Sequence, residues 1–157
     1  ENVITVLRRY GIESTDYDLH INFPGGAPID GPSAGIAIAT AIASAVSDTP
    51  LDNTIAMTGE LSIHGKVKPI GGVVAKVEAA FQAGVRTVFI PKDNWQQLFS
   101  GFKGLQIISV ETLDDVFEHV FGTRSFNAEQ SRAVAPIEPH VASAISVMHA
   151  GEVSVEP

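Results

Sequence analysis

A glycine-rich turn followed by a long run of small apolar residues is the feature that most constrains this chain. Residues 29–46 read IDGPSAGIAIATAIASAV, with Ala and Ile on every side of the apolar part. A helix that is apolar all round must be buried against closely packed neighbours. Glycine lets the backbone before such a helix pass close to other groups, and Pro32 fixes its entry angle. The segment therefore predicts a buried helix over 33–46 that begins in a tight turn at Ser33.

Ser33 is the candidate nucleophile. The start of a helix offers unpaired N–H groups that can hold an oxyanion. The loop backbone at this helix start is formed by Gly31, Pro32, Ser33 and Ala34. Two ordinary interpretations compete with catalysis. Gly-Pro-Ser-Ala-Gly is also a common turn sequence, and serine is a favoured helix N-cap.

A lysine on the apolar side of a second predicted helix, 73–83, is the candidate base. Lys76 has Val73 and Ala80 as neighbours at helical spacing. Burial disfavours an ammonium group, so a desolvated lysine is more readily neutral and can accept a hydroxyl proton. A serine with such a lysine is a known nucleophile and base pair. The alternative is that the lysine stem packs while its amine reaches water.

Taken together, these segments resemble the proteolytic domain of the Lon proteases, and their motif sequences are most similar to the bacterial LonB type. The matching segments follow one another without a gap from Ser33 to Lys76: DGPSAG at 30–35, MTGE at 57–60, GKVKPIGG at 65–72, and then Lys76. The resemblance implies an α/β layered domain, with a small mixed sheet packed with helices, over residues 1–121. It also implies that N-terminal strands of the domain are missing, and we expect residues 122–157 to be a flexible tail.

The same resemblance implies an ATP-dependent serine endopeptidase that degrades unfolded or misfolded proteins. Ser33 would be the nucleophile and Lys76 the general base. The Thr58 hydroxyl would help to position the lysine, and Asp30 would influence whether the site is open or closed. The ordinary interpretations are a strand-end threonine for Thr58 and an Asx turn for Asp30.

The resemblance also implies partners that this chain does not contain. We expect a homohexamer that receives substrates from an ATPase module, which would bind ATP and Mg²⁺. The chain has no Walker A sequence and needs no cofactor of its own, and its five histidines show no metal-ligand spacing with carboxylates. A cytoplasmic location is expected, and a membrane tether upstream stays open.

Two departures from the Lon pattern precede the nucleophile turn. His20 matches a histidine of many family members, but a second histidine often found there is Asn22 in this chain. The loop 24–30 is one residue shorter than the pattern. We therefore expect a structural role for His20, and both departures favour the LonB type over the LonA type.

Composition and charge exclude several other classes. A net charge of −8 and an isoelectric point of about 4.9 disfavour a nucleic-acid partner. The absence of cysteine excludes disulfides and thiolate chemistry, and the apolar run 36–46 is too short to span a bilayer. One alternative is a non-catalytic Lon-like scaffold for oligomerisation, although such domains generally lose the dyad. Another is a small-molecule kinase, which the lack of a longer Gly-Ser run disfavours.

The remaining pattern predicts the other elements of the domain. Alternating or continuous apolar runs indicate strands, and 3.6-residue periodicity with caps indicates helices. The expected elements are strands at 18–23, 54–57, 85–90 and 105–110, a hairpin at 61–67, and helices at 1–10, 94–99 and 112–121.

Overall fold

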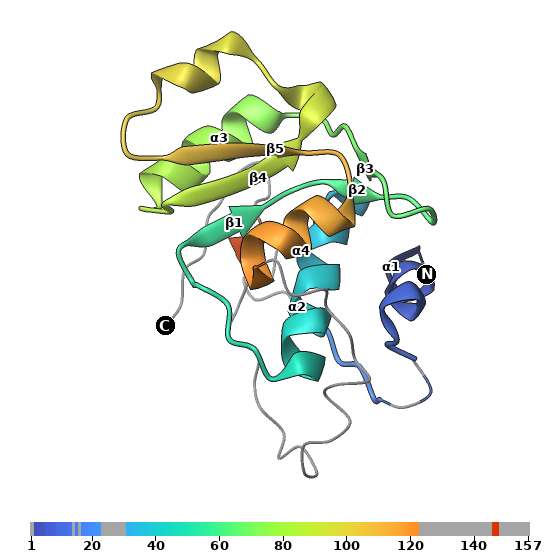
Figure 1. Ribbon diagram of the computed structural model, residues 1–157. Coiled ribbons are helices and arrows are strands. Elements are labelled where there is room, and N and C mark those ends of the chain that lie inside the picture. The colour runs from blue at the N-terminus through green and yellow to red at the C-terminus, as the bar shows by residue number, and fades with distance from the viewer. Residues whose placement is uncertain (1, 14, 16, 23–30, 123–145, 148–157) are drawn as a thin grey trace.

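A computed structural model describes residues 2–13, 15, 17–22, 31–122 and 146–147. They form helices on both faces of a parallel sheet, with a small antiparallel hairpin beyond one end of it (Figure 1). The sheet has the strand order β5-β4-β1-β6. Its strands are β1 (Ile55–Met57), β4 (Thr87–Pro91), β5 (Gln106–Val110) and β6 (Ser146–Val147). The predicted α/β architecture is confirmed.

The hairpin follows β1 directly. Its strands β2 (Glu60–Leu61) and β3 (Val67–Lys68) pair in antiparallel fashion, as the sequence predicted for 61–67. All three strand pairs of the main sheet are parallel. The chain therefore leaves β1, makes the hairpin and crosses one face of the sheet in a helix before returning as β4.

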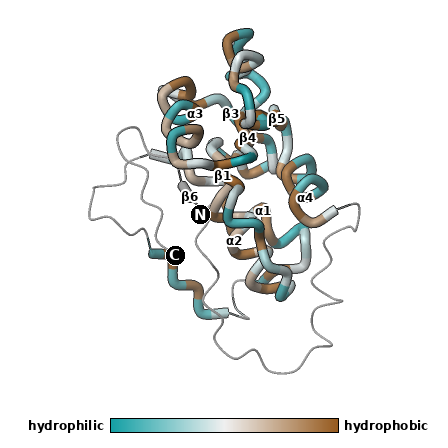
Figure 2. The backbone as a smooth tube through the Cα atoms, turned by 90° about the vertical axis from the view of Figure 1, so that its left-hand side faces the viewer, coloured by the Kyte–Doolittle hydropathy of each residue, from teal (hydrophilic) through white to brown (hydrophobic). Residues whose placement is uncertain are grey.

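Two apolar cores lie on the two faces of the sheet. On one face, α1 (Asn2–Leu7), α2 (Gly35–Ser47) and α4 (Leu113–Phe121) pack on Met57 and Phe89. On the other, α3 (Val73–Gln82) packs on Ala56 and Val88. Neighbouring strand residues serve opposite faces because side chains alternate along a strand. Figures 1 and 2 show α3 on the side of the sheet opposite α2 and α4.

The helix predicted over 33–46 is present and as deeply buried as its composition requires. A 3₁₀ turn, η3 (Pro32–Ala34), leads into α2. Nine of the thirteen residues of α2 are buried. Helix α1 continues as the 3₁₀ turn η1 (Arg8–Tyr10). No helix in the described part of the chain is both long and apolar enough to cross a bilayer.

Two expected elements differ. Residues 18–22 are not a strand, and Ile21 is 52% exposed. A strand needs a partner for its backbone groups, and the edge of β1 beside which a further strand could lie pairs with β6 instead. The helix expected at 94–99 is split into the 3₁₀ turns η4 (Lys92–Asn94) and η5 (Gln97–Gly101), because Trp95 and Gln96 are extended.

The predicted domain boundary near residue 121 stays a prediction. Helix α4 ends at Phe121, while residues 123–145 and 148–157 lie outside the described part of the chain. Within the predicted tail, Ser146 and Val147 are described, and they pair with Ala56 and Met57 of β1.

A capping box closes the N-terminus of α4, where Thr112 and Asp115 satisfy each other's backbone N–H groups at 2.9 and 3.2 Å. We expect Thr112→Ala to lower the free energy of unfolding by about 1 kcal/mol, since it leaves a helix-end donor without its cap. Urea denaturation measures this, with Thr15→Ala as the control at an exposed threonine. Equal stability of the two variants would contradict the prediction.

Candidate active site

The two predicted catalytic residues come from helices on opposite faces of the sheet. Ser33 lies in η3, directly before α2, and Lys76 is the fourth residue of α3. Helix α3 follows β1 and precedes the parallel strand β4, so its N-terminal end lies toward the carboxyl ends of both strands. The start of α2 is tied to the same end, because Ser33 is hydrogen-bonded to Gly59, two residues beyond β1. The topology thus directs both residues toward the same end of the sheet, where the carboxyl ends of β1 and β4 lie.

The turn that carries Ser33 is held by the segment after β1. The Gly59 N–H donates to the Ser33 carbonyl at 2.8 Å, and the Thr58 hydroxyl donates to the same oxygen at 3.3 Å. In return, the Ile36 N–H donates to the Gly59 carbonyl at 3.3 Å. The Thr58 N–H donates to the carbonyl of Phe89 in β4 at 3.0 Å. The turn of the candidate nucleophile is therefore fixed to the centre of the sheet.

Glycine is required at two positions of this turn for different reasons. Gly31 has φ +101°, a conformation that strains any residue with a side chain. Gly35 has an ordinary helical conformation, but a Cβ there would lie 2.7 Å from the backbone nitrogen of Leu61. The first glycine shapes the loop, and the second allows α2 to approach the hairpin.

The Ser33 hydroxyl has no capping function. Gly31 is the N-cap of η3 and Ala34 the N-cap of α2, and neither helix has a side-chain cap. Ser33 is half-buried, whereas Ala34 and Gly35 are buried. The N-cap interpretation of Ser33 is therefore wrong, and its hydroxyl remains available for chemistry.

Lys76 lies on the buried face of α3. The residue is only 6% exposed, and Val73, Val77 and Ala80 are the other buried residues of the helix. Burial lowers the pKa of the Lys76 amine below its ordinary value, and no charge among the described residues contributes to the shift. The predicted inward placement is confirmed. A neutral amine is what a general base requires.

The dyad is not closed by a hydrogen bond within the described residues: neither the Ser33 hydroxyl nor the Lys76 amine bonds to another of them. Catalytic hydrogen bonds often tighten only when substrate is bound. The Thr58 hydroxyl contacts the backbone of Ser33, a contact that the sequence did not indicate. Its expected action on the lysine stays a prediction.

The remaining predicted site residues are placed as follows. Asp30 lies outside the described residues, so its role stays a prediction. His20 is exposed, which gives no packing support to the structural role expected for it. In the part of the chain that the structure describes, no group of three or more His, Asp or Glu side chains could hold a metal ion.

Asn94 is a residue of this region that sequence reasoning missed. Its side-chain oxygen accepts a hydrogen bond from the Ile70 N–H at 2.7 Å, and its side-chain nitrogen donates to the Ile70 carbonyl at 3.0 Å. The two residues are 24 positions apart, a separation that no periodic pattern reveals.

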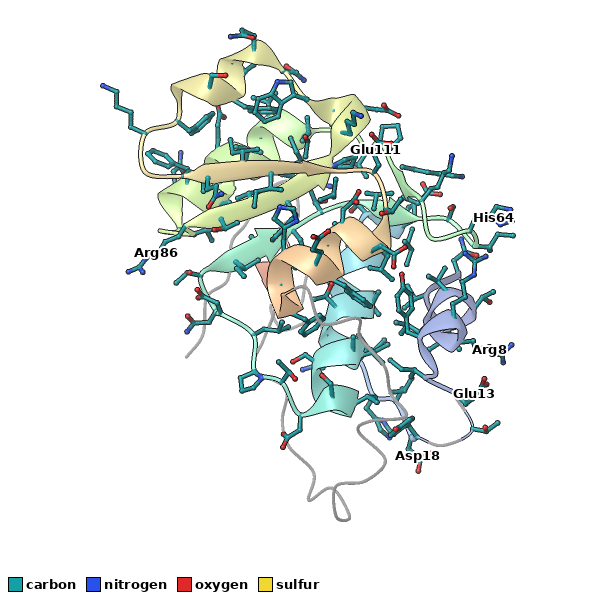
Figure 3. All side chains as sticks on the ribbon, viewed as in Figure 1. Arg8, Glu13, Asp18, His64, Arg86 and Glu111 are labelled. Atoms are coloured by element: carbon teal, nitrogen blue, oxygen red, sulfur yellow. The ribbon has the colours of Figure 1, made fainter. Side chains whose placement is uncertain are left out.

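A shallow groove of about 460 Å³ lies along the hairpin, away from the candidate dyad. Its lining includes His64, Lys66 and Lys68 but neither Ser33 nor Lys76. Figure 3 shows His64 at the tip of the hairpin, toward α1, and the Arg9 guanidinium donates to the His64 carbonyl at 2.9 Å. The groove is therefore a feature of the hairpin surface and not of the candidate dyad.

Comparison with known proteins identifies the family of the chain. Residues 3–123 match the family described as the Lon protease (S16) C-terminal proteolytic domain. The chain is 55% identical over 120 residues to Lon protease 2 of Bacillus subtilis, covering 76% of this chain and 22% of that protein. It is 43% identical over 124 residues to the archaeal Lon protease of Archaeoglobus fulgidus, covering 76% and 20%. With Lon protease 1 of Thermus thermophilus the identity is 51% over 108 residues, covering 66% and 14%.

The chain spans about a fifth of the length of the first two of these relatives. The match nevertheless covers most of the chain, and it includes the nucleophile turn, the Thr-Gly-Glu segment and the helix of Lys76. The chain therefore belongs to the family of Lon protease C-terminal proteolytic domains, which are serine peptidases.

Proposed function

We propose that this chain is the endopeptidase domain of an ATP-dependent protease and that it acts through Ser33 as nucleophile and Lys76 as general base. The observation that carries the proposal is the burial of Lys76, which lowers the pKa of its amine by desolvation. A lysine kept for surface charge would not be 6% exposed among valines and alanines. The hydroxyl of Ser33 lies directly before α2 and caps no helix, and it supplies the matching nucleophile.

The reaction follows from these two groups. Neutral Lys76 accepts the proton of the Ser33 hydroxyl while the Oγ atom attacks the peptide carbonyl. Backbone N–H groups of Ser33 and its neighbours Gly31 and Ala34 stabilise the tetrahedral oxyanion, and one such donor lowers the barrier by about 3 kcal/mol. The lysine then gives its proton to the leaving amine, and water hydrolyses the acyl-enzyme with the same lysine as base. The Thr58 hydroxyl supports the turn of Ser33 and helps to position the lysine, and Asp30 influences whether the site is open or closed.

The substrates and partners are proposals that rest on the family. We infer that the complete protein degrades unfolded or misfolded polypeptides in the cytoplasm as a homohexamer. ATP and Mg²⁺ would act in an ATPase module, with no cofactor bound by the residues of this chain. The three relatives named above are all called Lon proteases, which supports a polypeptide substrate.

Degradation of unfolded casein by the complete protein with ATP and Mg²⁺ tests the function. We expect ATP-dependent cleavage into peptides. Binding of casein without cleavage would instead identify the domain as a non-catalytic scaffold. A heat-stable folded protein of similar size serves as the control substrate and should remain intact.

The pH dependence of cleavage tests the base. Because Lys76 acts in its neutral form and burial lowers its pKa, we expect kcat to rise with pH through a midpoint below the pKa of an exposed lysine. The measurement is kcat for a short fluorogenic peptide between pH 5 and 10. Full activity at the acid end of this range would contradict a lysine base.

A further inference from the structure

The position of Lys76 depends on a short stretch of backbone that has little support of its own. Gly72 is the N-cap of α3 and has no side-chain cap. The Lys76 N–H closes the first turn of the helix on the Gly72 carbonyl at 3.2 Å. Gly71 and Gly72 are exposed, and open space surrounds the Cβ position of each. The place of Lys76 therefore follows from the place of Gly72.

The nearest firm anchor before Gly72 is Ile70, which Asn94 holds through its two hydrogen bonds. A carboxamide presents one donor and one acceptor side by side, so it can satisfy both backbone groups of a single residue, as a neighbouring strand would. Ile70 is also half-buried against the core under α3, which contains Val73 and Val77. The carboxamide and this core together set where the helix starts.

Asn94 itself follows β4, at the end of the 3₁₀ turn η4. The same strand fixes the other half of the site, because the Phe89 carbonyl accepts the Thr58 N–H at 3.0 Å. Thr58 in turn donates to the carbonyl of Ser33. Strand β4 therefore holds both helices of the candidate site. It holds the start of α2 through Thr58, and the start of α3 through Asn94.

We propose that Asn94 is a positioning residue for Lys76, whose carboxamide fixes the start of α3 relative to β4 and so holds the amine at the depth and distance that Ser33 requires. This inference rests on the proposed Ser33–Lys76 chemistry. Asn94 acts through the backbone of Ile70 and the first turn of α3.

The test compares Asn94→Ala with Asn53→Ala in the complete protein. Asn53 is an exposed asparagine in the turn before β1, and its side chain has no hydrogen bond to another described residue. We expect Asn94→Ala to lower kcat for a fluorogenic peptide by about 10- to 100-fold, since a displacement of about 1 Å can cost that much. KM should be unchanged, and Asn53→Ala should match the wild type.

The pH profile separates positioning from a general loss of stability. If the first turn of α3 is held less firmly, water reaches Lys76 and the pKa of its amine rises. The acid limb of the pH profile of kcat should then move to higher pH. No charged side chain of the described residues contributes to the shift of this amine, so a change in its burial is what the limb reports. A merely structural role would lower the melting temperature and leave the limb in place.

Asn94→Asp refines the test, because a carboxylate can accept from the Ile70 N–H but cannot donate to the Ile70 carbonyl. We expect the kcat of Asn94→Asp to lie between the values of the wild type and of Asn94→Ala. If Ser33→Ala abolishes cleavage while Asn94→Ala keeps the kcat and pH profile of Asn53→Ala, Asn94 has no positioning role. If Ser33→Ala still cleaves, it is the proposed function that fails.

Discussion

Ser33→Ala and Lys76→Met are each expected to reduce peptide cleavage by the complete protein at least about 1,000-fold, with the double variant no worse than either single one. The reason is that nucleophile and base act as a unit, so removal of one leaves the other without a function. The measurement is kcat/KM for a fluorogenic peptide at neutral pH. Cleavage retained in both single variants would mean that the nucleophile lies elsewhere.

The free energy of unfolding of the same variants tests whether the loss of cleavage is chemical and not a loss of folded protein. The Ser33 hydroxyl bonds to no other described residue, so Ser33→Ala should change the free energy of unfolding by less than about 0.5 kcal/mol. Methionine keeps the apolar stem of Lys76 and removes the amine whose charged form burial disfavours. Lys76→Met is therefore expected to be more stable than the wild type at neutral pH.

Proton linkage determines how the stability difference between Lys76→Met and the wild type changes with pH. The pKa of Lys76 is lowered in the folded protein, so between the folded and unfolded pKa values the unfolded chain binds more protons. The free energy of unfolding of the wild type then rises with pH across this window, and the advantage of Lys76→Met should shrink as the pH increases. An advantage that does not change with pH would indicate that the amine is not desolvated.

Gly35→Ala is expected to lower the free energy of unfolding by about 1 to 3 kcal/mol and to reduce cleavage by about 100-fold. The new Cβ would lie 2.7 Å from the Leu61 backbone nitrogen and 3.3 Å from the Gly59 carbonyl oxygen. Neither is the end of a flexible side chain, so α2 must move away from the segment after β1. That segment holds the carbonyl of Ser33, and the nucleophile moves with it.

The matched control is Gly101→Ala, where a Cβ meets open space and the backbone is not in the left-handed region. Its stability should stay within about 0.5 kcal/mol of the wild type. Urea denaturation and peptide cleavage of the two variants give the comparison. If Gly35→Ala behaves like Gly101→Ala, the close approach between α2 and Leu61 is not what fixes the nucleophile turn.

The sequence by itself determined the buried helix after Ser33, the inward face of Lys76 and the helix at 112–121. Each depends on neighbours a few positions apart, so composition and periodicity suffice to reveal it. The resemblance to Lon proteolytic domains, and not spacing alone, is what grouped Ser33, Thr58 and Lys76 as residues of one candidate site.

Only the tertiary structure decided how these pieces are held together. The contact of the Thr58 hydroxyl with Ser33, the approach of Gly35 to Leu61 and the pairing of Asn94 with Ile70 join residues 24 to 26 positions apart. The segment 18–22 alternates like a strand, yet it is not one, because strand formation depends on a partner and β1 pairs with β4 and β6. Such contacts arise when distant segments meet on a common sheet, and local sequence preferences contain no information about that meeting.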